Sequence, residues 1–166
     1  LFEYVTFPPC NNPVLIELQF LVVLFKVALP TICNTPDEET FIVHRGETCF
    51  VIMNAFPYSS GHVLVIPYRE VPDLELLTPQ ETSEIWATVT KAVQVLKAEY
   101  KPQGMNVGIN LGHAAGGSVA QHLHIHIVPR WGGDSNFMVA VATAKILPEA
   151  LDITAQRIRN RWKDMP

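Results

Sequence analysis

The pattern of apolar and polar positions divides much of the chain into short strands and a few longer helical segments. Apolar and β-branched residues form runs typical of strands, and these runs cover Thr40–His44, Glu47–Met53, His62–Tyr68 and Met105–Leu111. Arg45 and Gly46 predict a tight hairpin between the first two runs. Pro67 should close the third strand or place it at a sheet edge.

Two other segments follow the spacing of a helix. Thr78 can cap the first helix, Pro79 suits its first turn and Glu81 can complete a capping box. The helix should end near Lys101, and one face of it should carry Ile85, Val89, Ala92, Val93, Leu96 and Tyr100. A second helix is expected from about Pro148, with an apolar face formed by Leu151, Ala155, Ile158 and Trp162.

A fifth strand is predicted at His122–Arg130, where histidines alternate with apolar residues, and an exit turn should follow at Trp131–Asp134. Because successive side chains of a strand point to opposite faces, the apolar set should face the core. His122, His124 and His126 should then form an accessible row on the other face. Strands outnumber helices, which favours an α+β domain on an antiparallel sheet of about five strands.

Length and composition fit one globular domain over residues 1–166, with 48% apolar and 17% charged residues. We divide it into an N-terminal arm (1–35), a core (36–147) and a C-terminal helix (148–166). The arm contains the apolar run Val14–Leu29, which charged residues interrupt. A buried strand, a buried helix or a dimer contact is therefore favoured over a membrane span.

Charge and cysteine content restrict the partners. The formal net charge is −4, which argues against a nucleic-acid partner. Any anionic ligand must then be bound by local groups. Cys10, Cys33 and Cys49 form no C-x-x-C pair, which favours a reducing compartment and a cytoplasmic location.

Alternating histidines have two chemical interpretations. Two or three imidazoles can bind a metal ion, or one imidazole can attack phosphorus while its neighbours contact the phosphate oxygens. The preceding segment Gly116-Gly117-Ser118 can direct backbone N–H groups and a hydroxyl at an anion. This combination suits a phosphate better than a cation.

The block Gly116–Arg130 resembles the signature of the histidine-triad (HIT) family, His-φ-His-φ-His-φ-φ with φ apolar. The stretch Phe50–Pro67, which contains Asn54 and Gly61-His62-Val63-Leu64-Val65, resembles the early strands of that family. Residues Asn106–Trp131 look most similar to the branch that cleaves diadenosine tetraphosphate. The resemblance covers about residues 36–150.

The resemblance implies a role for each matching residue. His124 would attack the α-phosphate and form a nucleotidyl-histidine intermediate, while His122 and His126 would orient it and contact phosphate oxygens. The implied substrate-binding residues are Asn54 at the ribose, Asn110, Gly117 and Ser118 at the phosphate, Gln121, and Trp131 at the substrate end. Core packing is the alternative for Trp131. The resemblance also implies a homodimer.

Some HIT branches bind zinc through a C-x-x-C pair, but here Pro30 stands three positions before Cys33, and Glu70 stands where those branches often have a histidine. We therefore predict no metal and no cofactor. The predicted function is cleavage of dinucleoside polyphosphates, as a diadenosine tetraphosphate phosphorylase. The alternatives are a hydrolase of the same substrates, a nucleoside phosphoramidate hydrolase and a nucleotide-binding interaction module, with a metal-dependent hydrolase more distant.

Overall fold

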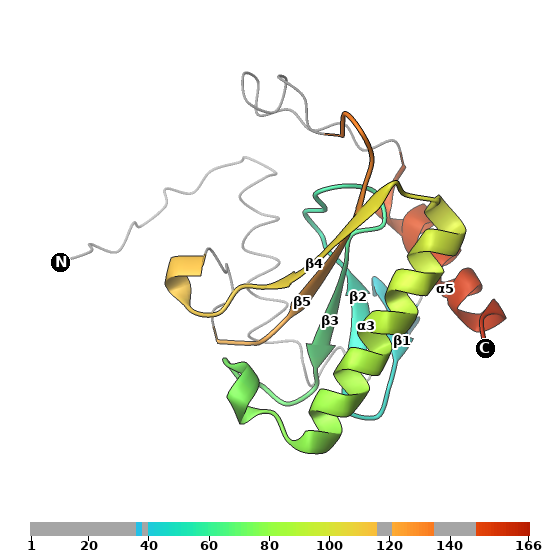
Figure 1. Ribbon diagram of the computed structural model, residues 1–166. Helices are drawn as coiled ribbons and strands as arrows, with labels where there is room; N and C mark the ends of the chain where they lie inside the picture. The colour runs from blue at the N-terminus through green and yellow to red at the C-terminus, as the bar shows by residue number, and fades with distance from the viewer. Residues whose placement is uncertain (1–35, 38–39, 116–120, 135–148) are drawn as a thin grey trace, which may run out of the picture. The chain divides into compact units, whose positions relative to one another are not determined.

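The computed structural model describes residues 36–37, 40–115, 121–134 and 149–166 (Figure 1). The predicted apolar run Val14–Leu29 and the predicted anion-binding segment Gly116-Gly117-Ser118 lie outside the described residues.

The centre of the fold is one antiparallel sheet with the strand order β1-β2-β3-β5-β4. Its strands are β1 (Ile42–Arg45), β2 (Cys49–Met53), β3 (Val63–Pro67), β4 (Gly104–Ile109) and β5 (Ile125–Arg130). The predicted α+β class with about five strands is confirmed. β5 is the last of these strands along the chain but lies between β3 and β4, so it is an inner strand of the sheet.

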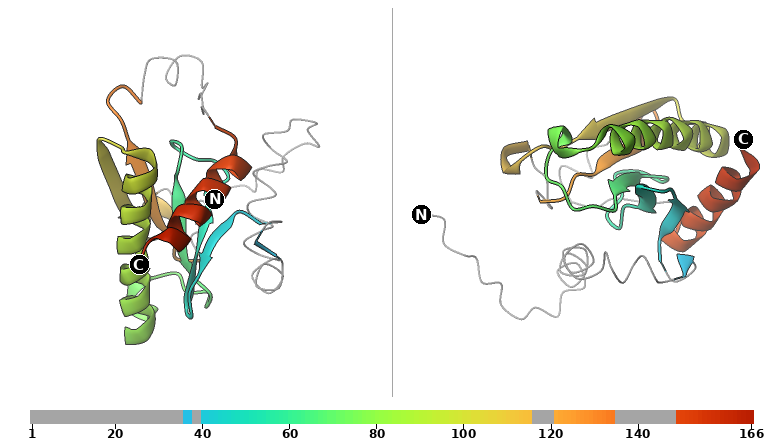
Figure 2. Two further views of the ribbon diagram at one scale, coloured as in Figure 1. Left: turned by 90° about the vertical axis from the view of Figure 1, so that its right-hand side faces the viewer. Right: turned by 90° about the horizontal axis from the view of Figure 1, so that it is seen from below.

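Two helices pack against this sheet. α3 (Pro79–Tyr100) lies along one face and α5 (Leu151–Asp164) crosses beside it and contacts β1 (Figure 2). Short 3-10 turns are η2 (Leu74–Leu76) and η3 (His113–Ala115). No helix in the described part of the chain is long and apolar enough to cross a membrane.

The start and end of α3 follow the sequence prediction. The Glu81 N–H donates to Thr78 Oγ1 at 3.2 Å, and Thr78 N–H donates to Glu81 Oε2 at 2.8 Å, which completes the capping box. Lys101 ends the helix in the left-handed conformation, with φ of 47°. Four residues of the predicted apolar face are buried, and Val93 and Tyr100 pack against the core while partly buried. Thr88 and Val95 are buried as well.

The core lies between the sheet and the two helices. Ile125 and Ile127 of β5 are 1% and 0% exposed and belong to the same cluster as Leu96 and Ile158. The apolar half of the predicted alternation is therefore confirmed. Burial of these apolar side chains stabilises β5 inside the sheet.

The prediction of an accessible histidine row is wrong for two of its members. β5 begins at Ile125, so His122 and His124 precede the regular strand, and they are only 2% and 6% exposed. The reason is that the segment before β5 hydrogen-bonds to the connection between β3 and α3. Leu123 N–H donates to the Val71 carbonyl at 2.7 Å.

The predicted Arg45-Gly46 hairpin turn is also displaced. Arg45 is the last residue of β1, and the turn comprises residues 46–48, closed by Gly46 N–H donating to the Cys49 carbonyl at 2.8 Å. Glu84 of α3 accepts hydrogen bonds from the N–H groups of Glu47 and Thr48, at 2.6 and 2.8 Å. A contact distant in sequence therefore favours the longer turn.

Candidate active site

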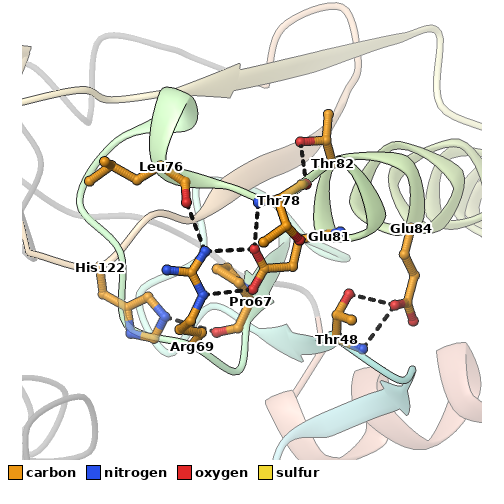
Figure 3. Close-up of polar contacts among 9 residues, drawn as sticks. All are labelled: Thr48, Pro67, Arg69, Leu76, Thr78, Glu81, Thr82, Glu84 and His122. Carbon is orange, nitrogen blue, oxygen red and sulfur yellow. Dashed lines mark hydrogen bonds and ion pairs between the residues drawn. The ribbon is translucent and has the colours of Figure 1, made fainter.

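The histidine segment (residues 122–126) runs beside the β3–α3 connector (residues 68–78). His122 Nε2 lies 2.9 Å from the Pro67 carbonyl oxygen, at the end of β3 (Figure 3). A carbonyl can only accept, so Nε2 carries the proton of the neutral His122 ring. Pro67 closes β3, as predicted, and its carbonyl is thereby directed at the site.

His124 has the opposite tautomer. Its Nδ1 lies 2.8 Å from the backbone carbonyl of His122, so Nδ1 carries the proton of the neutral ring. Nε2 is then the nitrogen that carries the lone pair and no proton. An imidazole fixed in this tautomer is oriented for attack by Nε2 on an electrophile.

The third histidine is oriented by a fourth. Tyr58 N–H donates to His62 Nδ1 at 3.0 Å, so the proton of His62 is on Nε2. His62 Nε2 lies 3.0 Å from His126 Nδ1 and therefore donates to it. The proton of His126 is consequently on Nε2, which has no hydrogen-bond partner among the described residues. His126 thus offers an unused N–H donor beside His124.

The flanking imidazoles are kept neutral by burial. Desolvation by burial, and second the nearby His124, lower the pKa of His126 to about 4. Burial also lowers the pKa of His122, which the Pro67 carbonyl and Glu70 partly oppose. At pH 7 both flanking rings are therefore hydrogen-bond donors without positive charge.

Ring contacts make the site compact. The centroids of His124 and His126 are 4.9 Å apart in an edge-to-face arrangement, and Tyr58 stacks on His62 at 4.9 Å. Gly61, just before His62, has φ of 81°, and an added Cβ there would lie 3.2 Å from Leu96. Glycine adopts this positive φ without strain and has no Cβ to crowd Leu96, which explains why glycine precedes His62 in the sequence.

Asn54 reaches the site through His62. Its Nδ2 lies 3.3 and 3.4 Å from the two ring nitrogens of His62, and its Oδ1 accepts from Phe56 N–H at 2.9 Å. Asn54 is 8% exposed. The structure therefore brings Asn54 to the histidine cluster, while its ribose contact stays a prediction.

A groove of about 550 Å³ opens next to His126. Its lining combines β4, the alternate residues of β5 and the loop after β2, and includes Tyr58, Asn106, Asn110, His126, Val128 and Arg130. Asn110 and His126, predicted from the sequence, therefore share one groove. Arg130 is bound by Asp134 at 2.6 and 2.8 Å and by Asn106 at 2.8 Å.

The other predicted site residues are not gathered at this groove. Among the described residues, Gln121 is exposed and Trp131 half-buried, and neither lines it. Trp131 begins the predicted turn after β5, which the Asp134 N–H closes on the Trp131 carbonyl at 3.1 Å. Gly117 and Ser118 lie outside the described residues, so their contact with phosphate stays a prediction.

Sequence reasoning missed the connector carbonyls and Tyr58. A backbone group leaves no mark in the residue pattern, and nothing distinguishes Tyr58 from other aromatic residues in a turn. His62 had a signal, because Gly61-His62 resembles the family. Over the described residues no three His, Cys, Asp or Glu side chains form a metal-binding group, and Cys33 lies outside them.

The fold and the histidine cluster together define a class, the α+β proteins that place a cluster of histidines at the start of an inner strand of an antiparallel sheet. Residues 35–133 match the HIT domain, and the chain belongs to the HIT family.

Among curated proteins, the chain is 45% identical over 130 residues to the "AP-4-A phosphorylase" of Mycobacterium tuberculosis, covering 78% of this chain and 67% of that protein. It is 39% identical over 93 residues to the asymmetrical bis(5'-nucleosyl)-tetraphosphatase of Schizosaccharomyces pombe, covering 56% of this chain and 50% of that protein. A zinc-bound histidine triad family protein from Mycobacterium smegmatis has the same fold, with a TM-score of 0.66 at 22% identity over 85% of this chain and 93% of that one.

Proposed function

We propose that the chain cleaves diadenosine tetraphosphate by phosphorolysis, through a nucleotidyl-histidine intermediate on His124. The observation that carries the proposal is the hydrogen bond from His124 Nδ1 to the His122 carbonyl, which leaves Nε2 unprotonated. The 45% identity to a protein named AP-4-A phosphorylase supports the choice of substrate and acceptor.

The first step forms a bond between His124 Nε2 and the α-phosphorus. The bond from that phosphorus to the bridging oxygen breaks, and its electron pair leaves with ATP. The positive charge that develops on the His124 ring is stabilised by the His122 carbonyl at Nδ1. His126 Nε2–H can donate to a phosphoryl oxygen, because no described residue occupies it.

In the second step an oxygen of inorganic phosphate attacks the same phosphorus. The nitrogen–phosphorus bond breaks, ADP is released and the His124 lone pair is restored. If water attacked instead, the products would be ATP and AMP and the chain would be a hydrolase. A nucleotide-binding module would not need an unprotonated Nε2 next to an unused donor, so an enzyme is favoured.

The test is incubation with diadenosine tetraphosphate, with and without inorganic phosphate, after treatment with a chelator. We expect ATP and ADP only when phosphate is present. ATP and AMP would contradict phosphorolysis and support the hydrolase. Turnover only of a nucleoside phosphoramidate would support that alternative, and no turnover of either substrate would support the binding module.

We also propose a homodimer. β4 is an edge strand, and Val107 on it and Leu111 after it are 42% and 40% exposed. A second copy could cover both side chains and pair with the open edge. Light scattering during gel filtration should give twice the monomer mass, and Val107→Lys should reduce it to the monomer.

A cytoplasmic location is the last part of the proposal. It is supported by Cys49, a buried free thiol whose pKa is raised by burial. Fractionation of cells that produce the tagged chain should find it with cytoplasmic markers.

A further inference from the structure

One peptide group links the histidine segment to the β3–α3 connector. It is the group between His122 and Leu123. Its carbonyl accepts from His124 Nδ1 at 2.8 Å, and its N–H donates to the Val71 carbonyl at 2.7 Å. Because a peptide group is planar, its N–H and C=O orientations cannot vary independently. A contact that fixes the Val71 carbonyl therefore also orients the His122 carbonyl, and the His122 carbonyl sets the tautomer of His124.

Val71 is 3% exposed and lies inside a connector that is closed by one arginine. Arg69 Nε donates to Glu81 Oε1 at 2.9 Å, and Arg69 Nη2 donates to Glu81 Oε2 and to the Leu76 carbonyl, both at 2.7 Å (Figure 3). The guanidinium thus joins the start of the connector to its end and to the first turn of α3. Two parallel bonds to one carboxylate give a defined geometry that a single charge contact lacks.

Glu81 is suited to anchor this closure. Its hydrogen bonds with Arg69, and next with Thr78, lower its pKa to about 2. It therefore remains ionised at any pH at which the chain is expected to work. It also belongs to the capping box of α3, so the connector is tied to a helix that packs on the sheet.

We propose that Arg69 and Glu81 are positioning residues for His124. They close the connector, the closed connector holds the Val71 carbonyl, and that carbonyl orients the His122–Leu123 peptide against the His124 ring. The inference rests on the proposed function only in treating His124 as the nucleophile. The orientation of its ring is a property of the free protein.

Glu84 provides a matched control. It lies one turn further along α3 and accepts hydrogen bonds from the N–H groups of Glu47 and Thr48 and from the Thr48 hydroxyl. Figure 3 shows this second carboxylate directed at the β1–β2 turn, away from the connector. Glu81 and Glu84 therefore both tie α3 to a loop, but only the loop bound by Glu81 reaches the histidine segment.

The first measurement is steady-state kinetics of Arg69→Gln, Glu81→Gln and Glu84→Gln. Glutamine at position 81 can still complete a capping box, so the helix start is retained. We expect kcat to fall about tenfold in the first two variants with KM changed less than about twofold, because a misplaced catalytic group slows the chemical step. Glu84→Gln should keep kcat within about twofold of the parent. Arg69→Lys retains the positive charge but not the two parallel hydrogen bonds, so its kcat should lie between those of the parent and of Arg69→Gln.

The second measurement needs no substrate. Long-range proton–nitrogen spectra of the histidine rings should show His124 protonated on Nδ1 in the parent and in Glu84→Gln. Arg69→Gln and Glu81→Gln should move its ring nitrogens toward the values of a tautomer mixture. An unchanged His124 ring in these two variants, or an equal change in Glu84→Gln, would overturn the inference. Since the spectra do not depend on turnover, a wrong substrate assignment would leave this result intact.

Discussion

The two ends of the histidine segment are oriented by different kinds of partner. At the His122 end the partners are backbone carbonyls of β3 and the connector, belonging to Pro67 and Val71. At the His126 end the partner is another imidazole, His62. A carbonyl can only accept a hydrogen bond, whereas an imidazole can accept or donate according to its protonation.

This difference separates a fixed end from a titratable end. The Pro67 and His122 carbonyls each select one tautomer of the neutral ring that they contact. At the His126 end, the direction of the His62–His126 hydrogen bond depends on which ring nitrogens carry protons. The nucleophile is oriented from the fixed end, and the phosphate donor is set from the titratable end.

The largest effect should come from removing the group that both ends serve. His124→Ala should lower kcat/KM by more than about 10³-fold, as is typical for loss of a nucleophile. Nucleotide binding, measured by calorimetry, should be largely retained. Activity within tenfold of the parent would refute the assignment of His124.

The next effect should come from the titratable end. His62→Phe keeps a ring against Tyr58 but removes the donor to His126, so kcat should fall by about 10- to 100-fold. The control is His44→Phe, because His44 is also desolvated but stacks on Trp162, 4.6 Å between centroids. Equal losses in both variants would mean that His62 has only a packing role.

A smaller effect is expected at Asn54, whose amide contacts His62. If Asn54 acts by positioning His62, Asn54→Ala should lower kcat about threefold and leave KM nearly unchanged, the size of one modest hydrogen bond. A rise in KM with unchanged kcat would instead support the predicted ribose contact. Steady-state kinetics at saturating phosphate would separate the two outcomes.

The smallest effect concerns acid stability, to which His126 and Glu81 should contribute in different pH ranges. The pKa of His126 is lowered to about 4 in the folded chain from an ordinary value of 6.5. The unfolded chain therefore binds this proton more tightly than the folded chain does. As a result, the free energy of unfolding falls as pH drops from about 6.5 to 4. Glu81 has its pKa lowered to about 2 from 4.5, so its contribution is complete above pH 4.5 and is lost toward pH 2.

Denaturant titrations at several pH values would check this. His126→Gln should weaken the pH dependence of the free energy of unfolding only above about pH 4, and Glu81→Gln only below about pH 4.5. A change in the same pH range for both variants would contradict the lowered pKa values assigned to His126 and Glu81.

The two ends of the histidine segment also differ in how well the sequence predicts them. The His126 end consists of side chains, and Asn54, His62 and His126 could all be identified from their motifs. The strands, the capping box of α3 and the apolar face of β5 were likewise predictable, because each has a local pattern of residue types.

The His122 end could not be predicted in the same way. The carbonyls of Pro67 and Val71 are present whatever the side chain, so only the fold reveals them. The same contacts bury His122 and His124, and alternation alone gave these residues the wrong exposure. Arg69 and Glu81 are visible in the sequence, but the link from them to His124 passes through backbone atoms.

The placement of β5 has a consequence for how the chain assembles. β1, β2 and β3 form one continuous meander, and β4 and β5 form a separate antiparallel pair that follows α3. The β3–β5 ladder joins the two units over only Val63–Val65 and Ile125–Ile127. Contacts that cross this junction include Pro67–His122, Val71–Leu123, His62–His126 and Ser59–Pro129.

The histidine site is therefore built on a joint between segments distant in sequence, and closing such a joint carries a high entropic cost. A partial opening along this joint would separate His122 from the Pro67 carbonyl, Leu123 from the Val71 carbonyl and His126 from His62 while the meander stayed intact. In native-state hydrogen exchange, the amide of Leu123 should then exchange through a lower-energy opening than the amides shared by β2 and β3. Activity would therefore report a fully folded domain, whereas helical content could be retained after this joint had opened.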